Sequence, residues 1–350
     1  MRILHILNEF DNAGNGIVNV CCDLVCEQSR LNHDVLVVSS GGEYVTLIEK
    51  FGATHFYLDQ SRTLINLPIM MIRFKEIVKE FNPDIIHAHM MTGTVIANLF
   101  KYFYKYKIIT TVHNEYQKSA VLMKFADITV GVSDAVTQAM LNRGVSAEKA
   151  VTIKNGVLNS PRRKKIQDIT PLQLKKPAIV TIGQLSKRKG SDILYEAFKN
   201  VYDVIPDVNL YYIGNPDWKE LVEIVQSSDY KNNIHFVGLE KEPLKYLLSA
   251  DLFVFPSLKE PFGLALIEAR EAKLPIIASN VDGIPEALDG GTAGILVKPN
   301  HVNELSEKII TLLQDKSLAA NYRQKAYHGI EKFTIKQMND KYLDAYKSLL

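Results

Sequence analysis

The sequence DLFVFPSLKEPFGLALIEAREAKLPIIASNVDGIPEAL, residues 251–288, contains the pattern that decides the fold. It opens with an apolar run typical of a buried strand, which ends at Pro256 and Ser257. A short loop follows, and a helix is predicted to begin near Gly263. The run PIIAS at 275–279 then predicts a second strand. A strand, a helix and a strand in this order predict a βαβ unit with parallel strands.

The same alternation continues outside this unit. Amphipathic segments of helical length separate most of the other strand-like runs. Repeated βα units imply parallel sheets with helices on both faces, so the predicted class is α/β. The runs lie at 2–7, 34–40, 55–59, 84–89, 107–113, 128–133, 150–156, 178–183, 209–214 and 233–238.

A polar, basic stretch divides the pattern into two halves. Residues 157–177 contain prolines and no sustained apolar period, which is typical of a connection between domains. We therefore predict a doubly wound, Rossmann-like domain at 1–160, a linker at 161–177 and a second such domain at 178–333. The final segment, 334–350, has the apolar spacing of a helix that needs a surface, and we expect it to pack back on the first domain.

Charge and composition exclude several classes of protein. With 41 basic and 39 acidic residues, the formal charge of +2 is too small to indicate nucleic-acid binding through phosphates. No run approaches the about 18 apolar residues of a membrane span, and the start is unlike a secretory signal, so we expect a cytoplasmic protein. The cysteines Cys21, Cys22 and Cys26 lack the paired CxxC spacing of zinc or redox sites, so we expect buried thiols.

The predicted helix start near Gly263 offers a site for an anion. Free N–H groups and the positive end of the helix dipole favour a diphosphate there. Glu260 precedes the helix and Glu268 lies within it, so two carboxylates bracket the site. Ionised carboxylates only accept hydrogen bonds, which suits the hydroxyls of a sugar and of a ribose. The alternative is that both acids only complement the N-terminal half of a helix.

With its surroundings, EPFGLALIE at 260–268 resembles the E-x7-E motif of glycosyltransferase family 4, whose members have the GT-B fold and retain the anomeric configuration. The resemblance covers essentially the whole chain through DIIHAH, TTVHN, VGVS, IKNGV, GQLSKRKG and FVG, in that order. It implies two Rossmann-like domains that face each other across a cleft. The N-terminal domain would lie on the acceptor side, and the C-terminal domain would bind a nucleotide sugar.

The resemblance also implies roles for single residues. Glu260 matches the acid that contacts donor-sugar hydroxyls, and Glu268 matches the acid that binds ribose. Lys189 matches the lysine that neutralises the leaving diphosphate, a role that needs a fixed positive charge beside a developing anion. A solvated surface lysine is the alternative for Lys189. The backbone implied to bind the donor is that of Phe262, Gly263 and Leu264 at the diphosphate and of Gly238 and Leu258 near the base.

One position departs from the family pattern. Members usually have arginine directly after the glycine of GQLSKRKG, whereas this chain has Gln184, a neutral donor. Either Lys187 or Arg188 supplies the missing charge, or the diphosphate binds more weakly. An inactive relative is the extreme interpretation.

In the N-terminal half, Gly14 and Gly16 interrupt the passage from the first strand to a helix, where glycine lets backbone approach a ligand. Asn19 stands at the last glycine position of G-x-G-x-x-G. The chain therefore lacks the complete dinucleotide-binding motif that would be the best evidence for a nicotinamide-dependent enzyme. TTVHN resembles the family segment whose histidine meets the donor sugar, so His113 joins Glu260 and Lys189 as a predicted catalytic residue.

Two other histidines fall on the same strands or their ends. His89 ends the strand before that of His113, and either residue could instead be a structural histidine. His87 lies inside its strand, where packing is the expected role.

The resemblance implies a retaining glycosyltransferase that moves a hexose or N-acetylhexosamine from a UDP-linked sugar to an acceptor hydroxyl. Since the sequence has no D-x-D element, we expect no metal site and no cofactor besides the donor. The implied acceptor is a glycan or lipid-linked glycan of surface polysaccharide synthesis. The run KYFYKYK at 101–107 fits either a peripheral contact with a membrane surface or an ordinary helix end.

Two alternatives come from other functional classes. A non-catalytic module that binds sugar nucleotides is favoured only by Gln184. A glycan phosphorylase would need a pyridoxal phosphate lysine, which the sequence does not identify.

Overall fold

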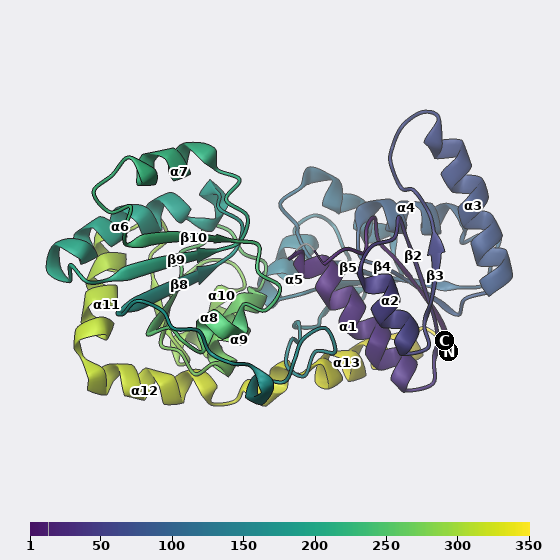
Figure 1. Cartoon of the computed structure of the whole chain (residues 1–350). Coiled ribbons are helices and arrows are strands. Elements are labelled where there is room, and N and C mark those ends of the chain that lie inside the picture. The colour runs from purple at the N-terminus through teal and green to yellow at the C-terminus, as the bar shows by residue number, and fades with distance from the viewer. Residues whose placement is uncertain (13) are drawn as a thin grey trace. The chain divides into compact units, whose positions relative to one another are not determined.

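The computed structural model describes residues 1–12 and 14–350 (Figure 1). The chain forms two compact units, one made of Met1–Arg162 with Phe333–Leu350 and the other of Arg163–Lys332. The boundary between the units lies inside the stretch predicted as a linker, 161–177. Most of that stretch lies in the second unit, where the N–H of Lys175 donates to the Tyr211 hydroxyl at 2.9 Å.

The first unit is built on a seven-stranded sheet in which neighbouring strands are parallel. The order is β3-β2-β1-β4-β5-β6-β7, so the chain winds outward from β1 in one direction and then, after a crossover to β4, in the other. This confirms the predicted doubly wound, α/β arrangement. The strands are β1 (Arg2–Ile6), β2 (Asp34–Ser39), β3 (Thr54–Tyr57), β4 (Ile85–Ala88), β5 (Lys107–Val112), β6 (Ile128–Gly131) and β7 (Ala150–Thr152).

Apolar side chains project from both faces of this sheet. On β2, Val35 and Val37 pack on one side with Cys22 and Cys26 of the first helix, while Leu36 and Val38 pack on the other with the third and fourth helices. The expected burial of the three cysteines is therefore confirmed. The helices between strands are α1 (Gly16–Arg30), α2 (Tyr44–Lys50), α3 (Asn66–Phe81), α4 (Met91–Phe100), the 3-10 helix η1 (Lys118–Phe125) and α5 (Asp134–Leu141).

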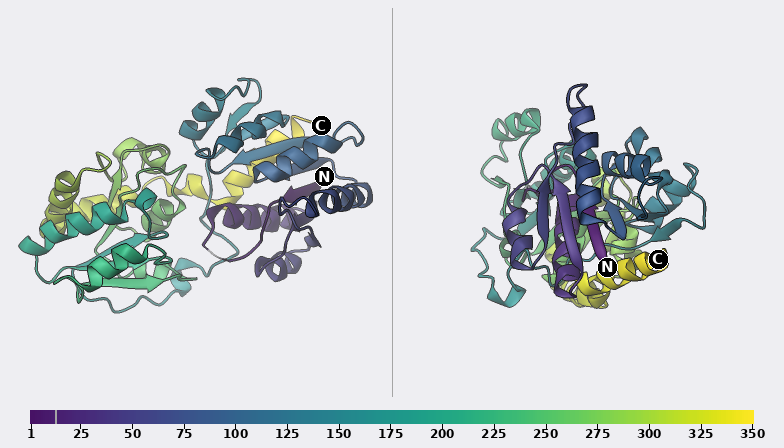
Figure 2. Two further views of the ribbon diagram at one scale, coloured as in Figure 1. Left: turned by 90° about the horizontal axis from the view of Figure 1, so that it is seen from above. Right: turned by 90° about the vertical axis from the view of Figure 1, so that its right-hand side faces the viewer.

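The C-terminal helix α13 (Ile335–Lys347) also belongs to the first unit, where it packs beside α1 (Figure 1). Its Met338, Tyr342 and Tyr346 are buried. The Thr334 hydroxyl caps the helix by accepting from the N–H of Gln337 at 3.3 Å. The chain therefore ends close to where it begins, as both further views show (Figure 2).

The second unit contains a six-stranded sheet of the same kind, in the order β10-β9-β8-β11-β12-β13. The short edge strand β13 was not predicted. The strands are β8 (Ala178–Ile182), β9 (Asn209–Ile213), β10 (Ile234–Gly238), β11 (Leu252–Phe255), β12 (Ile276–Ser279) and β13 (Ile295–Val297).

Helices cover the second sheet as well, and Leu194 and Phe198 of α6 pack with Ile309 of α11 on one face. Among the described residues, no helix has both the length and the apolar character needed to cross a bilayer. The α-helices are α6 (Ser191–Val204), α7 (Lys219–Gln226), α8 (Leu244–Leu247), α9 (Leu264–Glu271), α10 (Ile284–Ala287), α11 (Val302–Gln314) and α12 (Lys316–Tyr327). The 3-10 helices are η2 (Ile166–Asp168), η3 (Lys187–Lys189), η4 (Asp289–Gly291) and η5 (Ile330–Phe333).

Candidate functional site

The loop that follows β8 carries Lys189 at the carboxyl end of the sheet. Two glycines shape this loop, Gly183 with φ 147° and Gly190 with φ 65°. A Cβ on Gly190 would lie 2.1 Å from the Pro256 carbonyl oxygen, so only glycine fits there. Because Gly190 is both the C-cap of η3 and the N-cap of α6, this close approach fixes η3 against the end of β11.

The loop that follows β11 brings Glu260 to the same place. The ammonium of Lys189 forms an ion pair with the Glu260 carboxylate, and both side chains are mostly buried. Backbone contacts hold the two loops together, because the N–H of Leu258 donates to the Arg188 carbonyl at 2.8 Å. Asp282 accepts from the N–H of Glu260 at 2.9 Å. The structure thus brings together two of the predicted catalytic residues.

Helix α9 begins directly after this loop. Its N-cap is Gly263, with φ 93° and ψ 73°, and a glycine supplies no side chain to accept from the first-turn N–H groups. Phe262 is buried beside it, and Leu264 opens the helix. Glu268 lies four residues after Leu264 and therefore on the same face of α9. The predicted anion site thus has the expected local form.

Buried Arg270 anchors the other end of α9. Its guanidinium donates to the carbonyl oxygens of Ala326, Ala287 and His328 at 2.8, 2.6 and 2.8 Å. It also donates to the Asp289 carboxylate at 2.8 Å. These bonds compensate the burial of its charge and fix the direction of α9. The sequence analysis missed Arg270, because its partners lie 17 to 58 positions away along the chain.

Three other predicted donor-binding residues lie around the same sheet edge of the second unit. The Gln184 amide donates to Asp217 at 2.7 Å, so one of its two N–H donors is already engaged. Gly238 ends β10 with φ 83°, and a Cβ there would meet nothing within 4 Å. Leu258 is half-buried. The contacts of these three residues with a donor stay predictions. It also stays a prediction that Lys187 or Arg188 supplies the positive charge that is missing at Gln184.

In the first unit, Gly16 is the first residue of α1. Asn15 caps this helix, because its side-chain oxygen accepts from the N–H of Ile17 at 3.1 Å. Gly14 has φ 69°, the left-handed conformation that glycine favours. Gly14 and the capped start of α1 thus have the local form expected of a close backbone approach, and their role in binding stays a prediction.

His113 follows β5 and is joined to other buried histidines. Its Nε2 lies 3.2 Å from Nδ1 of His89, and Nε2 of His89 lies 3.0 Å from Nδ1 of His5. Burial lowers the pKa of His113 to about 3 and the pKa of His5 to about 4. Burial also holds the pKa of His87 and of His89 well below the ordinary value. All four rings are therefore neutral near pH 7.

His87 has the packing role expected of it. It lies on the sheet face under α1 and α13, where its two ring nitrogens bond the Tyr346 and Thr111 hydroxyls at 2.7 Å each. His5 and Tyr346, which complete this cluster, were missed by the sequence analysis. The signals available were a histidine inside the strand-like run RILHIL at 2–7 and two tyrosines one helical turn apart in α13.

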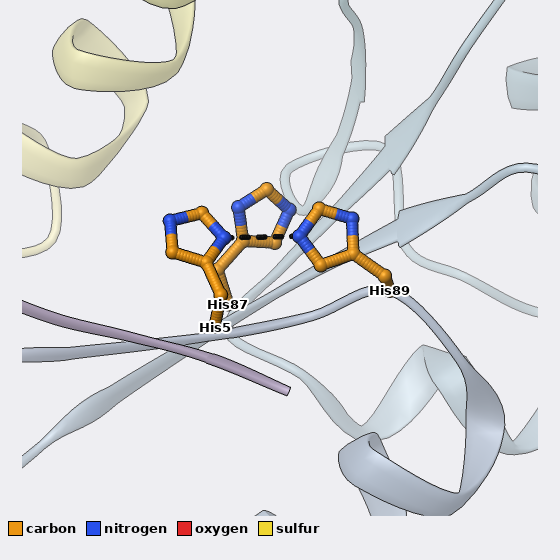
Figure 3. A group of neighbouring side chains, drawn as sticks. All are labelled: His5, His87 and His89. Carbon is orange, nitrogen blue, oxygen red and sulfur yellow. Dashed lines mark hydrogen bonds between the residues drawn. The ribbon is translucent and has the colours of Figure 1, made fainter. Parts of the chain in front are cut away.

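The rings of His5, His87 and His89 also form the kind of group that holds metal ions, with one nitrogen of each within 4.8 Å of the others (Figure 3). However, His87 stacks on His89 at 4.2 Å and 28°. Lone pairs lie in the ring planes, so stacked rings do not aim them at one point. The geometry fits a network of hydrogen bonds better, and the expected lack of a metal site stays a prediction.

Two family models match this chain in succession. The model of Glycosyltransferase Family 4 matches residues 14–158, and the model of glycosyl transferases group 1 matches residues 162–329. Together they span most of both units.

Curated relatives are similar over most of their length. The N-acetyl-alpha-D-glucosaminyl L-malate synthase of Bacillus anthracis is 25% identical, with 79% of this chain and 78% of that protein covered. The N,N'-diacetylbacillosaminyl-diphospho-undecaprenol alpha-1,3-N-acetylgalactosaminyltransferase of Campylobacter jejuni is 23% identical, with 97% of each covered.

Solved structures show the same fold. Anabaena HepE in complex with UDP has a TM-score of 0.83 at 20% identity, over 99% of this chain and 100% of that one. WaaG, a glycosyltransferase of lipopolysaccharide biosynthesis, has a TM-score of 0.76 at 14% identity, over 98% and 99%. With two doubly wound sheets, these likenesses confirm the GT-B fold.

Proposed function

The chain belongs to the glycosyltransferases of family 4 and group 1, and from this membership we propose that it transfers a hexose or N-acetylhexosamine from a UDP-sugar to an acceptor hydroxyl with retention of configuration. The observation that carries the proposal is the contact between Lys189 and Glu260 beside the glycine-capped start of α9. A cation, a carboxylate and a helix N-terminus in one place suit a sugar diphosphate.

In this reaction the bond from the sugar C1 to the diphosphate oxygen breaks, and a bond from C1 to the acceptor oxygen forms on the same face. The acceptor proton passes to the leaving diphosphate oxygen. Lys189 and the α9 amides stabilise the negative charge that develops there. Glu260 accepts hydrogen bonds from sugar hydroxyls and orients the ring, without forming a covalent adduct.

The remaining contacts follow the family roles. Glu268 binds the ribose hydroxyls, and the backbone near Gly238 and Leu258 meets the base. His113 contacts the donor sugar near the reacting carbon. UDP is the proposed nucleotide because the structurally similar HepE was solved with UDP and with UDP-glucose. In this proposal Lys189 and the α9 amides face the charge of the diphosphate, and no metal ion is required.

The proposed acceptor is a lipid-linked glycan presented at the cytoplasmic face of a membrane. One relative acts on a diphospho-undecaprenol acceptor, according to its name. The first unit exposes large apolar side chains, with Leu64 at 89%, Tyr102 at 91% and Phe103 at 78% exposed. Exposed Lys105 follows Tyr102 and Phe103 closely in the sequence, so the segment 102–105 combines apolar and cationic groups that suit anionic lipid headgroups.

A screen of nucleotide sugars tests the donor. We expect a UDP-sugar to raise the unfolding temperature more than GDP- or ADP-sugars, because binding stabilises the fold by RT ln(1 + [L]/Kd). When the same donor is then tested with a broad panel of acceptors, we expect a glycoside product. The rate of its formation should be the same with and without EDTA. Binding without turnover would favour the non-catalytic module, and phosphate-dependent release of sugar would favour the phosphorylase.

Sedimentation with vesicles tests the membrane contact. We expect binding to vesicles of anionic lipid that weakens with added salt and with Phe103→Ser. The control is Ile224→Ser, which changes an exposed apolar residue of the second unit. Equal binding of both variants and the wild type would count against this surface.

A further inference from the structure

One run of hydrogen bonds joins eight buried polar side chains inside the first unit. They come from α1, α13 and three central strands or their ends, and each bonds the next. Buried polar groups need such partners, since an unpaired one costs about 1–3 kcal/mol. In order, this hydrogen-bond chain contains His113, His89, His5, Gln28, Tyr346, His87, Thr111 and Tyr342.

Gln28 of α1 stands at the middle of the hydrogen-bond chain. Its Oε1 lies 2.8 Å from Nε2 of His5, and its Nε2 donates to the Tyr346 hydroxyl at 3.3 Å. The Tyr346 hydroxyl, which accepts from Gln28, is left to donate to Nδ1 of His87 at 2.7 Å. An amide oxygen only accepts and an amide NH₂ only donates, so Gln28 gives the whole run one direction.

The direction fixes the proton on each ring. A neutral imidazole has one N–H and one lone pair. Because Oε1 of Gln28 accepts, His5 carries its proton on Nε2 and accepts at Nδ1. His89 must then donate from Nε2 and accept at Nδ1, so His113 donates from Nε2. The depressed pKa values of these rings keep all three neutral near pH 7.

We propose that Gln28 is a positioning residue that, through His5 and His89, holds the proton of His113 on Nε2 and leaves Nδ1 as a hydrogen-bond acceptor. Gln28 lies 85 positions before His113 in the sequence. In this proposal it acts on the candidate site only through His5 and His89. If the amide were reversed, every bond between Gln28 and His113 would reverse with it, and Nδ1 would become a donor.

The consequence for chemistry rests on the proposed function. A lone pair on Nδ1 accepts a hydrogen bond from a hydroxyl of the donor sugar, whereas an N–H at the same place would meet that hydroxyl's proton. A hydroxyl that met the N–H would have to turn an oxygen lone pair toward the ring and its proton elsewhere. The tautomer therefore favours one orientation of the sugar hydroxyl over the other.

The direct test is a long-range ¹H–¹⁵N spectrum of the full chain labelled at histidine, which distinguishes protonated from bare ring nitrogens. We expect His5, His89 and His113 all to be protonated on Nε2. A proton on Nδ1 of His113 in the wild type would overturn the proposal. This result does not depend on a substrate, so it is separate from any failure of the proposed transfer reaction.

Variants of Gln28 test whether this residue controls the tautomer of His113. Gln28→Glu keeps an oxygen that accepts from His5, so it should keep the Nε2 tautomer of His113. Gln28→Leu removes the acceptor, so the His113 signal should show a mixture of tautomers, and kcat should fall about tenfold with KM within about twofold. Thr111→Val is the matched control, because it removes one hydroxyl from the other half of the run at nearly constant volume.

The outcomes separate positioning from general packing. If Thr111→Val redistributes the His113 proton as much as Gln28→Leu does, Gln28 does not set the tautomer. The same conclusion holds if a folded Gln28→Leu protein keeps the Nε2 tautomer. Thermal unfolding of each variant shows whether it is folded, and where Gln28→Leu fails to fold, the wild-type spectrum and Gln28→Glu decide.

Discussion

The two units place polar groups at the carboxyl ends of similar parallel sheets by different means. In the second unit, Lys189 and Glu260 meet because glycines shape two neighbouring loops, and the close approach of Gly190 to Pro256 locks them together. In the first unit, His113 depends on side chains buried under α1 and α13, several of them far away in the sequence.

The difference shows two ways of fixing a functional group. Loop glycines act through local backbone geometry, which tolerates changes at a distance but not an added Cβ. The buried histidines act through a shared network, in which each member depends on its neighbours. The first kind of site should therefore fail by steric clash, and the second by loss of hydrogen bonds or by protonation.

The largest effect is expected at Gly190. Gly190→Ala should lower the free energy of unfolding of the second unit by about 3 kcal/mol or more, because its Cβ would meet the Pro256 carbonyl oxygen. Gly290→Ala is the matched control: φ is 69° there against 65° at Gly190, but the Cβ would meet nothing within 4 Å. The control should cost about 1 kcal/mol. Urea unfolding measures both, and equal losses would refute the close contact as the cause.

Lys189→Ala should give the next largest effect. We expect kcat to fall about 100-fold while the acceptor KM changes little, because the lost charge acts on the leaving diphosphate. Lys231→Ala, which changes an exposed lysine of the second unit outside this loop, should keep most activity. Steady-state kinetics with both substrates varied provides the measurement. Equal loss in kcat and in acceptor affinity would argue against the assigned role.

Acid should destabilise the first unit through its histidines. In the unfolded chain their pKa is about 6.5, whereas burial lowers the pKa of His5 to about 4. Between these values the unfolded chain binds more protons, so the free energy of unfolding falls as pH falls, by up to about 1.4 kcal/mol per pH unit for each such histidine.

Urea midpoints at pH 7, 6 and 5 test this dependence. His5→Gln should make the fall shallower, because it removes one of the buried rings whose pKa is lowered. A midpoint that does not move with pH would contradict the neutral, buried state of the rings.

The smallest effect is expected at the end of the hydrogen-bond chain. Tyr342→Phe removes the hydroxyl that lies 2.9 Å from Thr111, and this should cost about 1 kcal/mol. Tyr57→Phe, at a residue 66% exposed, should change the stability little. Thermal unfolding compares the two, and an unchanged Tyr342→Phe protein would show that this bond adds nothing to the fold.

The sequence by itself determined the α/β class, nearly all the strands, the two doubly wound sheets and the placement of Lys189, Glu260 and Gly263 at strand ends. These features follow from local periodicity, from glycine at special backbone angles and from short motifs, all of which act over a few residues. The family resemblance added the expected roles.

Only the tertiary structure decided which polar groups meet. Gln28 bonds Tyr346 across 318 positions, and the partners of Arg270 come from separate helices and turns. The direction of the hydrogen bonds that reach His113 depends on these contacts. Periodicity indicates which face of an element is buried, but the partner of a buried polar group is set by how distant elements pack, so no local pattern contains it.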